Sequence, residues 1–223
     1  MIAASGEPLV RWYWIGDHGS QIWGYTQTHM RVALLPVLFG LVISLPIGIL
    51  CSRFNKAYPA VLATANTIYA IPSLALFMIF VQYTGLNEST VMIPLTLYSL
   101  SVLIPNVVDG LASVSDPVRQ AATAMGFGPL RRLLQVELPI AVPIVIAGVR
   151  IAAVSSISLV AVGELIGQGG LGYYIVNGNQ INFPTEIIVA TVLIVLLALL
   201  TDTILVILQR LLTPWARARG RTA

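Results

Sequence analysis

Five stretches of this sequence are apolar over about 20 residues each, the length that a helix needs to cross the hydrocarbon core of a bilayer. In lipid only helices and closed barrels satisfy the backbone, and these runs lack the alternating polarity of barrel strands. Only 9% of the 223 residues are charged, too few to coat a soluble domain. The sequence therefore predicts an all-α, polytopic membrane protein. The expected spans are 32–51, 58–83, 90–111, 139–165 and 187–208.

The basic residues predict the orientation of these spans. If the C-terminus is cytoplasmic, nine of the 12 lysine and arginine residues fall on the cytoplasmic side, as the positive-inside rule requires. The N-terminus is then expected outside the cell membrane. The nine are Arg53, Lys56, Arg119, Arg131, Arg132, Arg210, Arg217, Arg219 and Arg221, whereas Arg11 and Arg31 lie outside and Arg150 lies within a span.

The domain organisation is expected to be simple, because no internal repeat is visible. Residues 1–30 are predicted to form an extracytoplasmic or interfacial segment without a signal peptide, and both histidines, His18 and His29, are expected at the interface. Residues 31–209 form the transmembrane domain, and 210–223 a basic cytoplasmic tail. Prolines and glycines within the spans indicate either kinks and close packing or hinges of a moving pathway.

The longest cytoplasmic loop, residues 112–138, carries its own helix signals. Asp116 is predicted as the N-cap of a helix, with a proline at the first helical position, and the segment 118–125 is rich in alanine. Gly126 and a later Gly-Pro pair should end this helix. A second short helix is expected over 130–138, with the next span opening at a proline. Such a module could dock a protein partner, or it could lie on anionic lipid.

The same loop carries a motif. Gln120-Ala121-Ala122, Gly126 and Val136-Glu137-Leu138-Pro139 resemble the EAA loop of ABC importer permeases. The departure is Gln120, where the family usually has glutamate; glutamine keeps the size and the hydrogen-bonding capacity but drops the charge. The resemblance implies that the short helix inserts into a groove of a separate ATPase. The residues it assigns to ATPase coupling are Asp116, Gln120, Ala121, Ala122, Gly126, Leu138 and Pro139.

Flanking segments resemble the osmoprotectant branch of these permeases, which carries glycine betaine, choline, carnitine or proline. They are Ile71-Pro72-Ser73-Leu74-Ala75-Leu76, Asn106 with Gly110, Ala147-Gly148-Val149-Arg150, and the glycine-rich run from Ile166 to Gly172. The resemblance covers roughly residues 29–212. It implies three kinds of partner besides lipid: ABC ATPase subunits, a second permease chain that is identical or paralogous, and an extracytoplasmic substrate-binding protein. A nucleic-acid partner is not expected.

The chain is not expected to hydrolyse ATP. A P-loop needs a Gly-Lys pair, and the only lysine, Lys56, follows Asn55. No catalytic set or metal-ligand spacing is visible, so neither enzyme activity nor a cofactor is expected. Three alternatives stay open: a permease for methionine or another small nutrient, a stand-alone secondary transporter, and a non-transporting membrane scaffold. Secondary transporters usually show inverted repeats, which are not seen here.

Ionisable residues within spans are costly and often functional. Arg150 lies about 16 Å along its helix from Pro139, near the middle of the bilayer. It is expected either to pair with a carboxylate such as Asp109 or Asp202, or to serve a pathway or gate. Glu164 could attract cations at an outer mouth or lie exposed at the interface. The candidate pathway or gate residues are Pro72, Ser73, Asn106, Arg150 and Glu164.

Overall fold

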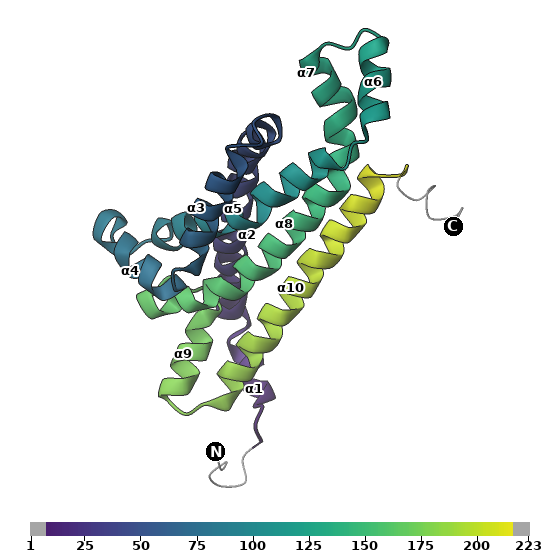
Figure 1. Cartoon of the computed structure of the whole chain (residues 1–223). Helices are drawn as coiled ribbons and strands as arrows, with labels where there is room; N and C mark the ends of the chain where they lie inside the picture. Colours follow the sequence, from purple (N-terminus) through teal and green to yellow (C-terminus); the bar gives the residue numbers. More distant parts are fainter. Residues whose placement is uncertain (1–7, 216–223) are drawn as a thin grey trace. The chain divides into compact units, whose positions relative to one another are not determined.

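The computed structural model describes residues 8–215, and this part of the chain contains helices and no strand, which confirms the predicted all-α fold. In order, the elements are α1 (Trp12–Asp17), α2 (Gly19–Arg53), α3 (Tyr58–Ala70), α4 (Ser73–Thr84), α5 (Ser89–Ala112), α6 (Asp116–Ala124), α7 (Pro129–Arg132), the π turn η1 (Leu133–Glu137), α8 (Leu138–Val160), the 3₁₀ turn η2 (Ala161–Ile166), α9 (Gly172–Gln180) and α10 (Pro184–Leu212) (Figure 1).

Four helical segments are long and apolar enough to cross a membrane. They are Gly19–Arg53, Ser89–Ala112, Pro129–Ile166 and Pro184–Leu212. The second predicted span, 58–83, is broken between α3 and α4, where the two helices are bent by 92°. The break lies at Ile71 and Pro72, because the residue before a proline disfavours the helical conformation. Together the pair makes up a fifth candidate span.

The chain forms two compact units. The first unit holds the residues up to Pro36, Ile71–Leu95 and Val154–Leu200. The second unit holds Val37–Ala70, Thr96–Ala153 and the residues from Thr201 onward. Each of the long helices α2, α5, α8 and α10 contributes residues to both units.

The second unit has an apolar core beneath the loop that joins α5 to α8. Buried side chains of α5, η1 and α8 pack together, and side chains of α2 cover them. The core residues are Val107, Leu111, Leu133, Ala141 and Val145, flanked by Leu41, Leu45, Ile49 and Leu138. The loop therefore lies on the closely packed side chains of α2, α5 and α8.

Glycine allows α2 and α5 to approach closely. A β-carbon on Gly48 would lie 2.5 Å from Val107 Cγ1 and 2.7 Å from Val107 Cβ, well inside van der Waals contact. Val107 Cβ is fixed to the backbone of α5, so rotation of a side chain could not relieve this clash. Gly48 therefore sets the distance between the two helices, as small residues do in membrane helix interfaces.

Replacing Gly48 by alanine is expected to lower the free energy of unfolding by about 2 kcal/mol, since the added methyl forces α2 and α5 apart. The matched control is Gly24→Ala in the same helix, where a β-carbon would meet nothing within 4 Å. Better helix propensity should make that control equal to the parent or more stable by about 0.5 kcal/mol. Denaturant titration in mixed micelles measures both. Equal stability of the two variants would contradict the packing argument.

In the first unit, His29 of α2 is fully buried, and the expectation of an interfacial position is wrong for this residue. Its Nδ1 lies 3.2 Å from the Gly169 carbonyl oxygen and its Nε2 lies 2.9 Å from that of Ile157. Gly170 has a φ of +54°, and a β-carbon there would lie 2.8 Å from His29 Cα. The glycine run after η2 thus folds directly against the histidine.

Candidate functional site: the loop between α5 and α8

The loop contains a short helix that ends as the sequence predicts. Helix α6 runs over Asp116–Ala124, and Gly126 follows it with a φ of +81°, a conformation that favours glycine. The predicted N-cap is wrong by one position, because Ser115 occupies it and Asp116 begins the helix. In the first turn, the Asp116 carboxylate still interacts favourably with the helix dipole.

The second half of the loop is continuous with the next span, so the expected separate helix and the start at Pro139 are wrong. Helix α7 passes through η1 into α8 without a break. Within η1 the Leu138 N–H donates to the Leu133 carbonyl, five residues back. This π turn ends at Glu137, two residues before Pro139, whose missing N–H would interrupt a regular ladder. The helix therefore passes the proline without ending.

Helix α6 presents a row of uncharged side chains to the surroundings, beside the exposed Asp116. Gln120 and Ala121 are exposed, as are Pro117, Ala124 and Met125, which lie on the same side at helical spacing. Ala122 is 1% exposed and points into the loop. In Figure 1, α6 and α7 extend together beyond the ends of α5 and α8. The loop thus offers a protruding helix with a small-residue face.

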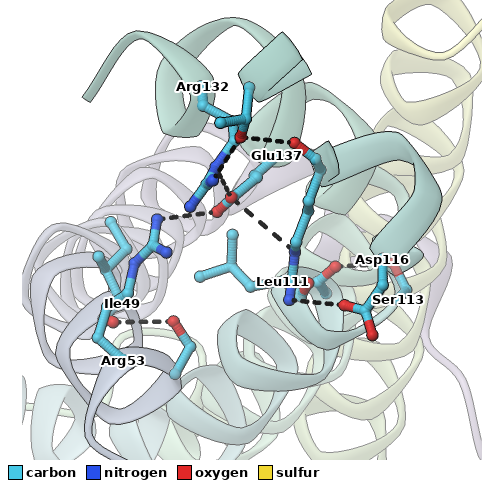
Figure 2. A network of polar contacts seen from close by, with 11 residues as sticks. Ile49, Arg53, Leu111, Ser113, Asp116, Arg132 and Glu137 are labelled. Atoms are coloured by element: carbon cyan, nitrogen blue, oxygen red, sulfur yellow. Dashed lines mark hydrogen bonds and ion pairs between the residues drawn. The ribbon is translucent and has the colours of Figure 1, made fainter. Parts of the chain in front are cut away.

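A buried carboxylate lies at the base of this loop. Glu137 is 2% exposed and accepts hydrogen bonds from Arg53 Nη2 at 3.1 Å and from Arg132 Nε at 2.9 Å (Figure 2). Arg119 Nε lies 3.9 Å from the same Oε1 atom. A buried charge requires such compensation, because desolvation disfavours it strongly. The single carboxylate thus joins the end of α2 to α6 and to α7.

The arginines of the loop are also held by the loop itself. Arg119 Nη2 donates to the carbonyl of Leu111 at 2.7 Å, one of the last carbonyls of α5 that lack an intrahelical partner. Arg119 also lies 3.8 Å from the exposed Asp116 carboxylate. Arg132 Nη1 donates to Thr123 Oγ1 at 3.0 Å. These contacts turn Arg119 and Arg132 inward and leave the Asp116 carboxylate as the exposed charge of α6.

Sequence reasoning missed the role of Glu137, which it treated only as part of the motif ending. Of the three arginines around Glu137, Arg132 is five residues away in the chain, whereas Arg53 is 84 residues away and comes from another helix. One signal was visible: Glu137 is the only glutamate in a loop that carries three arginines.

The intramembrane arginine forms the predicted ion pair with Asp202, not with Asp109. Arg150 donates through Nε at 2.7 Å and through Nη2 at 3.0 Å to the two oxygens of Asp202. A bidentate pair fixes the relative orientation of the two side chains and also pairs their charges. It joins α8 to α10 within the second unit.

The other candidate pathway residues are distributed over the two units. In the second unit, Asn106 Nδ2 donates to the Val102 carbonyl at 2.8 Å. In the first unit, Pro72 and Ser73 open α4, and Glu164 accepts a hydrogen bond from the Gly169 N–H at 3.0 Å. Helix α4 packs against η2, the element that contains Glu164.

The chain is similar to known transport proteins. Residues 44–218 match the family described as "Binding-protein-dependent transport system inner membrane component". The chain is 34% identical to the glycine betaine/carnitine/choline transport system permease protein OpuCD of Bacillus subtilis over 92% of each chain. It is 34% identical to the choline transport system permease protein OpuBD of the same organism, over 96% of this chain and 94% of that protein. Against the osmoprotectant import permease protein OsmW of Salmonella typhimurium it is 31% identical over 89% of this chain and 94% of that protein.

The fold is also similar to a solved structure. An inward-facing conformation of the MetNI methionine ABC transporter matches with a TM-score of 0.77 and 24% identity, covering 86% of this chain and 96% of that chain. At this identity the match shows the fold alone.

Proposed function

The chain belongs to the family of binding-protein-dependent transport system inner membrane components, and from this premise we propose that it imports a small osmoprotectant. It is the membrane-spanning permease subunit of an ATP-driven ABC importer. The substrate class is that of glycine betaine, choline, carnitine and proline. The observation that carries the substrate class is the identity of 31–34% over most of the chain to permeases named for such solutes.

The loop between α5 and α8 is the proposed docking element for the ATPase. The exposed side chains around Gln120 and Ala121 are uncharged, with the Asp116 carboxylate one turn before Gln120, and such a surface suits insertion into a groove. Ala122 holds α6 to the loop from inside, and Gly126 allows the turn that follows. Leu138 is half-buried and packs against the core of the second unit, with Pro139 beside it. Because Gln120 is neutral, the groove need not present a cation at that position.

The proposed assembly has two permease chains, two ATPase subunits and an extracytoplasmic binding protein. ATP hydrolysis takes place on the ATPase subunits, whose closure switches the permease between inward-open and outward-open states. Nucleotide can drive this switch only by binding the two states with different affinity. In this assembly residues 1–30 lie outside, 31–209 form the permease domain, and 210–223 form a cytoplasmic tail, of which 216–223 lie outside the described residues.

The proposed pathway or gate comprises Pro72, Ser73, Asn106, Arg150 and Glu164. The break between α3 and α4 supports the first two, because discontinuous helices often line substrate routes in transporters. The bidentate contact with Asp202 supports a bracing role for Arg150 within that pathway. Asn106 and Glu164 carry polar groups that a solute could meet.

The proposal is tested by replacing Ala121 with tryptophan. Because Ala121 is exposed, the fold should persist while the bulky ring blocks the groove, so the amount of co-purified ATPase should fall about tenfold and uptake should stop. The same change at the exposed Ala57, between α2 and α3, is the matched control and should retain both. Ala122 is unsuitable for this test, since a large side chain there would disrupt α6 itself.

Uptake in proteoliposomes tests the substrate class. The parent complex should import labelled choline or glycine betaine and should not import labelled methionine. Uptake that persists in the Ala121→Trp chain, or that needs no ATP, would contradict the importer and favour a stand-alone carrier.

A further inference from the structure

The apolar core beneath the loop does not by itself fix the position of the loop on α2. Side chains such as Leu45 and Ile49 contact this core through non-directional packing. Contacts of this kind resist separation, but they oppose a sideways slide only weakly. A directional polar contact is needed to hold the loop in one register.

Arg53 provides that contact. It is the last residue of α2, and it reaches the buried Glu137 carboxylate at 3.1 Å. Arg119 and Arg132, the other two arginines at this carboxylate, belong to the loop, so the bond from Arg53 is the one that crosses to α2. Buried polar groups are best attested as devices that fix register, and the Glu137 side chain is 3% exposed.

We propose that the Arg53–Glu137 ion pair transmits the ATP-driven displacement of α6 to α2, and that both are positioning residues for transport. The inference rests on the proposed function. When the ATPase moves α6, Arg119 and Arg132 carry Glu137 with it, and Glu137 moves the end of α2 through Arg53. Without this bond the loop moves while α2 lags behind, so nucleotide is hydrolysed without import.

The burial of the two partners decides which one to change. The Glu137 side chain is 3% exposed, and its loss would leave three guanidinium groups together, which threatens the fold. The Arg53 side chain is 38% exposed, so its removal leaves Glu137 bound to Arg132 and Arg119. Arg53→Gln therefore breaks the transmitting bond and keeps the loop intact.

The experiment uses the complete complex in proteoliposomes and measures solute imported per ATP hydrolysed. In Arg53→Gln this ratio should fall about fivefold to tenfold, while co-purified ATPase and melting temperature stay close to those of the parent. Arg53→Lys keeps the charge and should restore at least half of the ratio. The matched control is Arg31→Gln in the same helix, because Arg31 pairs with Glu88 and lies away from the loop in sequence.

A spin-label measurement supplies a second readout. With Cys51 replaced by serine, labels at Lys56→Cys and at Leu130→Cys, an exposed position of α7, report the distance between the end of α2 and the loop. In the parent the distribution should stay narrow both without nucleotide and with ATP trapped. In Arg53→Gln it should broaden when ATP is trapped.

The outcomes separate the inference from the proposed function. An unchanged ratio and an unchanged distribution in Arg53→Gln, in a complex whose parent needs ATP, would overturn the inference alone. Import and hydrolysis that fall together at a constant ratio would also overturn it, since that is the result of general destabilisation. Import by the parent without an ATPase would overturn both proposals.

Discussion

Replacing Arg150 by methionine is expected to lower the free energy of unfolding by about 3 kcal/mol, because it leaves Asp202 as an unpaired carboxylate within the membrane. The parent carboxylate receives two hydrogen bonds from the guanidinium, at 2.7 and 3.0 Å. Lipid offers no donor to replace them. Equilibrium unfolding in mixed micelles, followed by tryptophan fluorescence, measures the loss.

The double variant Arg150→Met/Asp202→Leu separates the interaction energy of the ion pair from the effect of each single substitution. Removing both charges should recover most of the lost stability, since a matched apolar pair is often as stable as the ion pair that it replaces. The double-mutant cycle then gives the coupling between the two side chains directly. A single variant as stable as the parent would contradict the bracing role proposed for Arg150.

Replacing Glu137 by alanine is expected to cost about 2–3 kcal/mol of unfolding free energy, because three guanidinium groups then lie together without a counter-charge. The loss is smaller than for a fully buried pair, since the arginine side chains are 38%, 33% and 21% exposed and water screens them in part. Glutamine keeps the shape and one acceptor, so Glu137→Gln should lose about half as much. The same unfolding titration measures both.

Glu88→Gln is the control for this change. Glu88 is paired with an arginine on the exposed side of the first unit, and loss of such a pair should alter stability by about 0.5 kcal/mol or less. If Glu137→Ala and Glu88→Gln had equal effects, burial would not be what makes Glu137 important.

The spans and the loop helix could be predicted because their signals are local. Apolar runs of about 20 residues identify spans without any knowledge of partners. A proline after Asp116 and a glycine at position 126 mark the ends of α6 within one or two residues. The exact cap was wrong, as helix ends usually are, because Ser115 and Asp116 are both good capping residues.

The polar contacts could not be predicted, since they depend on which distant segments meet. His29 binds two backbone carbonyls that lie 128 and 140 residues further along, and no property of its neighbours reveals them. Glu137 likewise depends on Arg53 from another helix. The partner of Arg150 could be predicted in part. The free-energy cost of a lone charge in lipid predicts a carboxylate partner, but the sequence offered two, Asp109 and Asp202.

The break between α3 and α4 limits what can surround it. At a helix end several N–H and C=O groups lack intrahelical partners, and here two ends meet within an otherwise apolar stretch. Hydrocarbon chains cannot satisfy these groups, so irregular backbone at membrane depth is stable only against protein or in a wetted cavity. Ile71 and Pro72 therefore mark a place where the chain is turned away from the acyl chains of the bilayer.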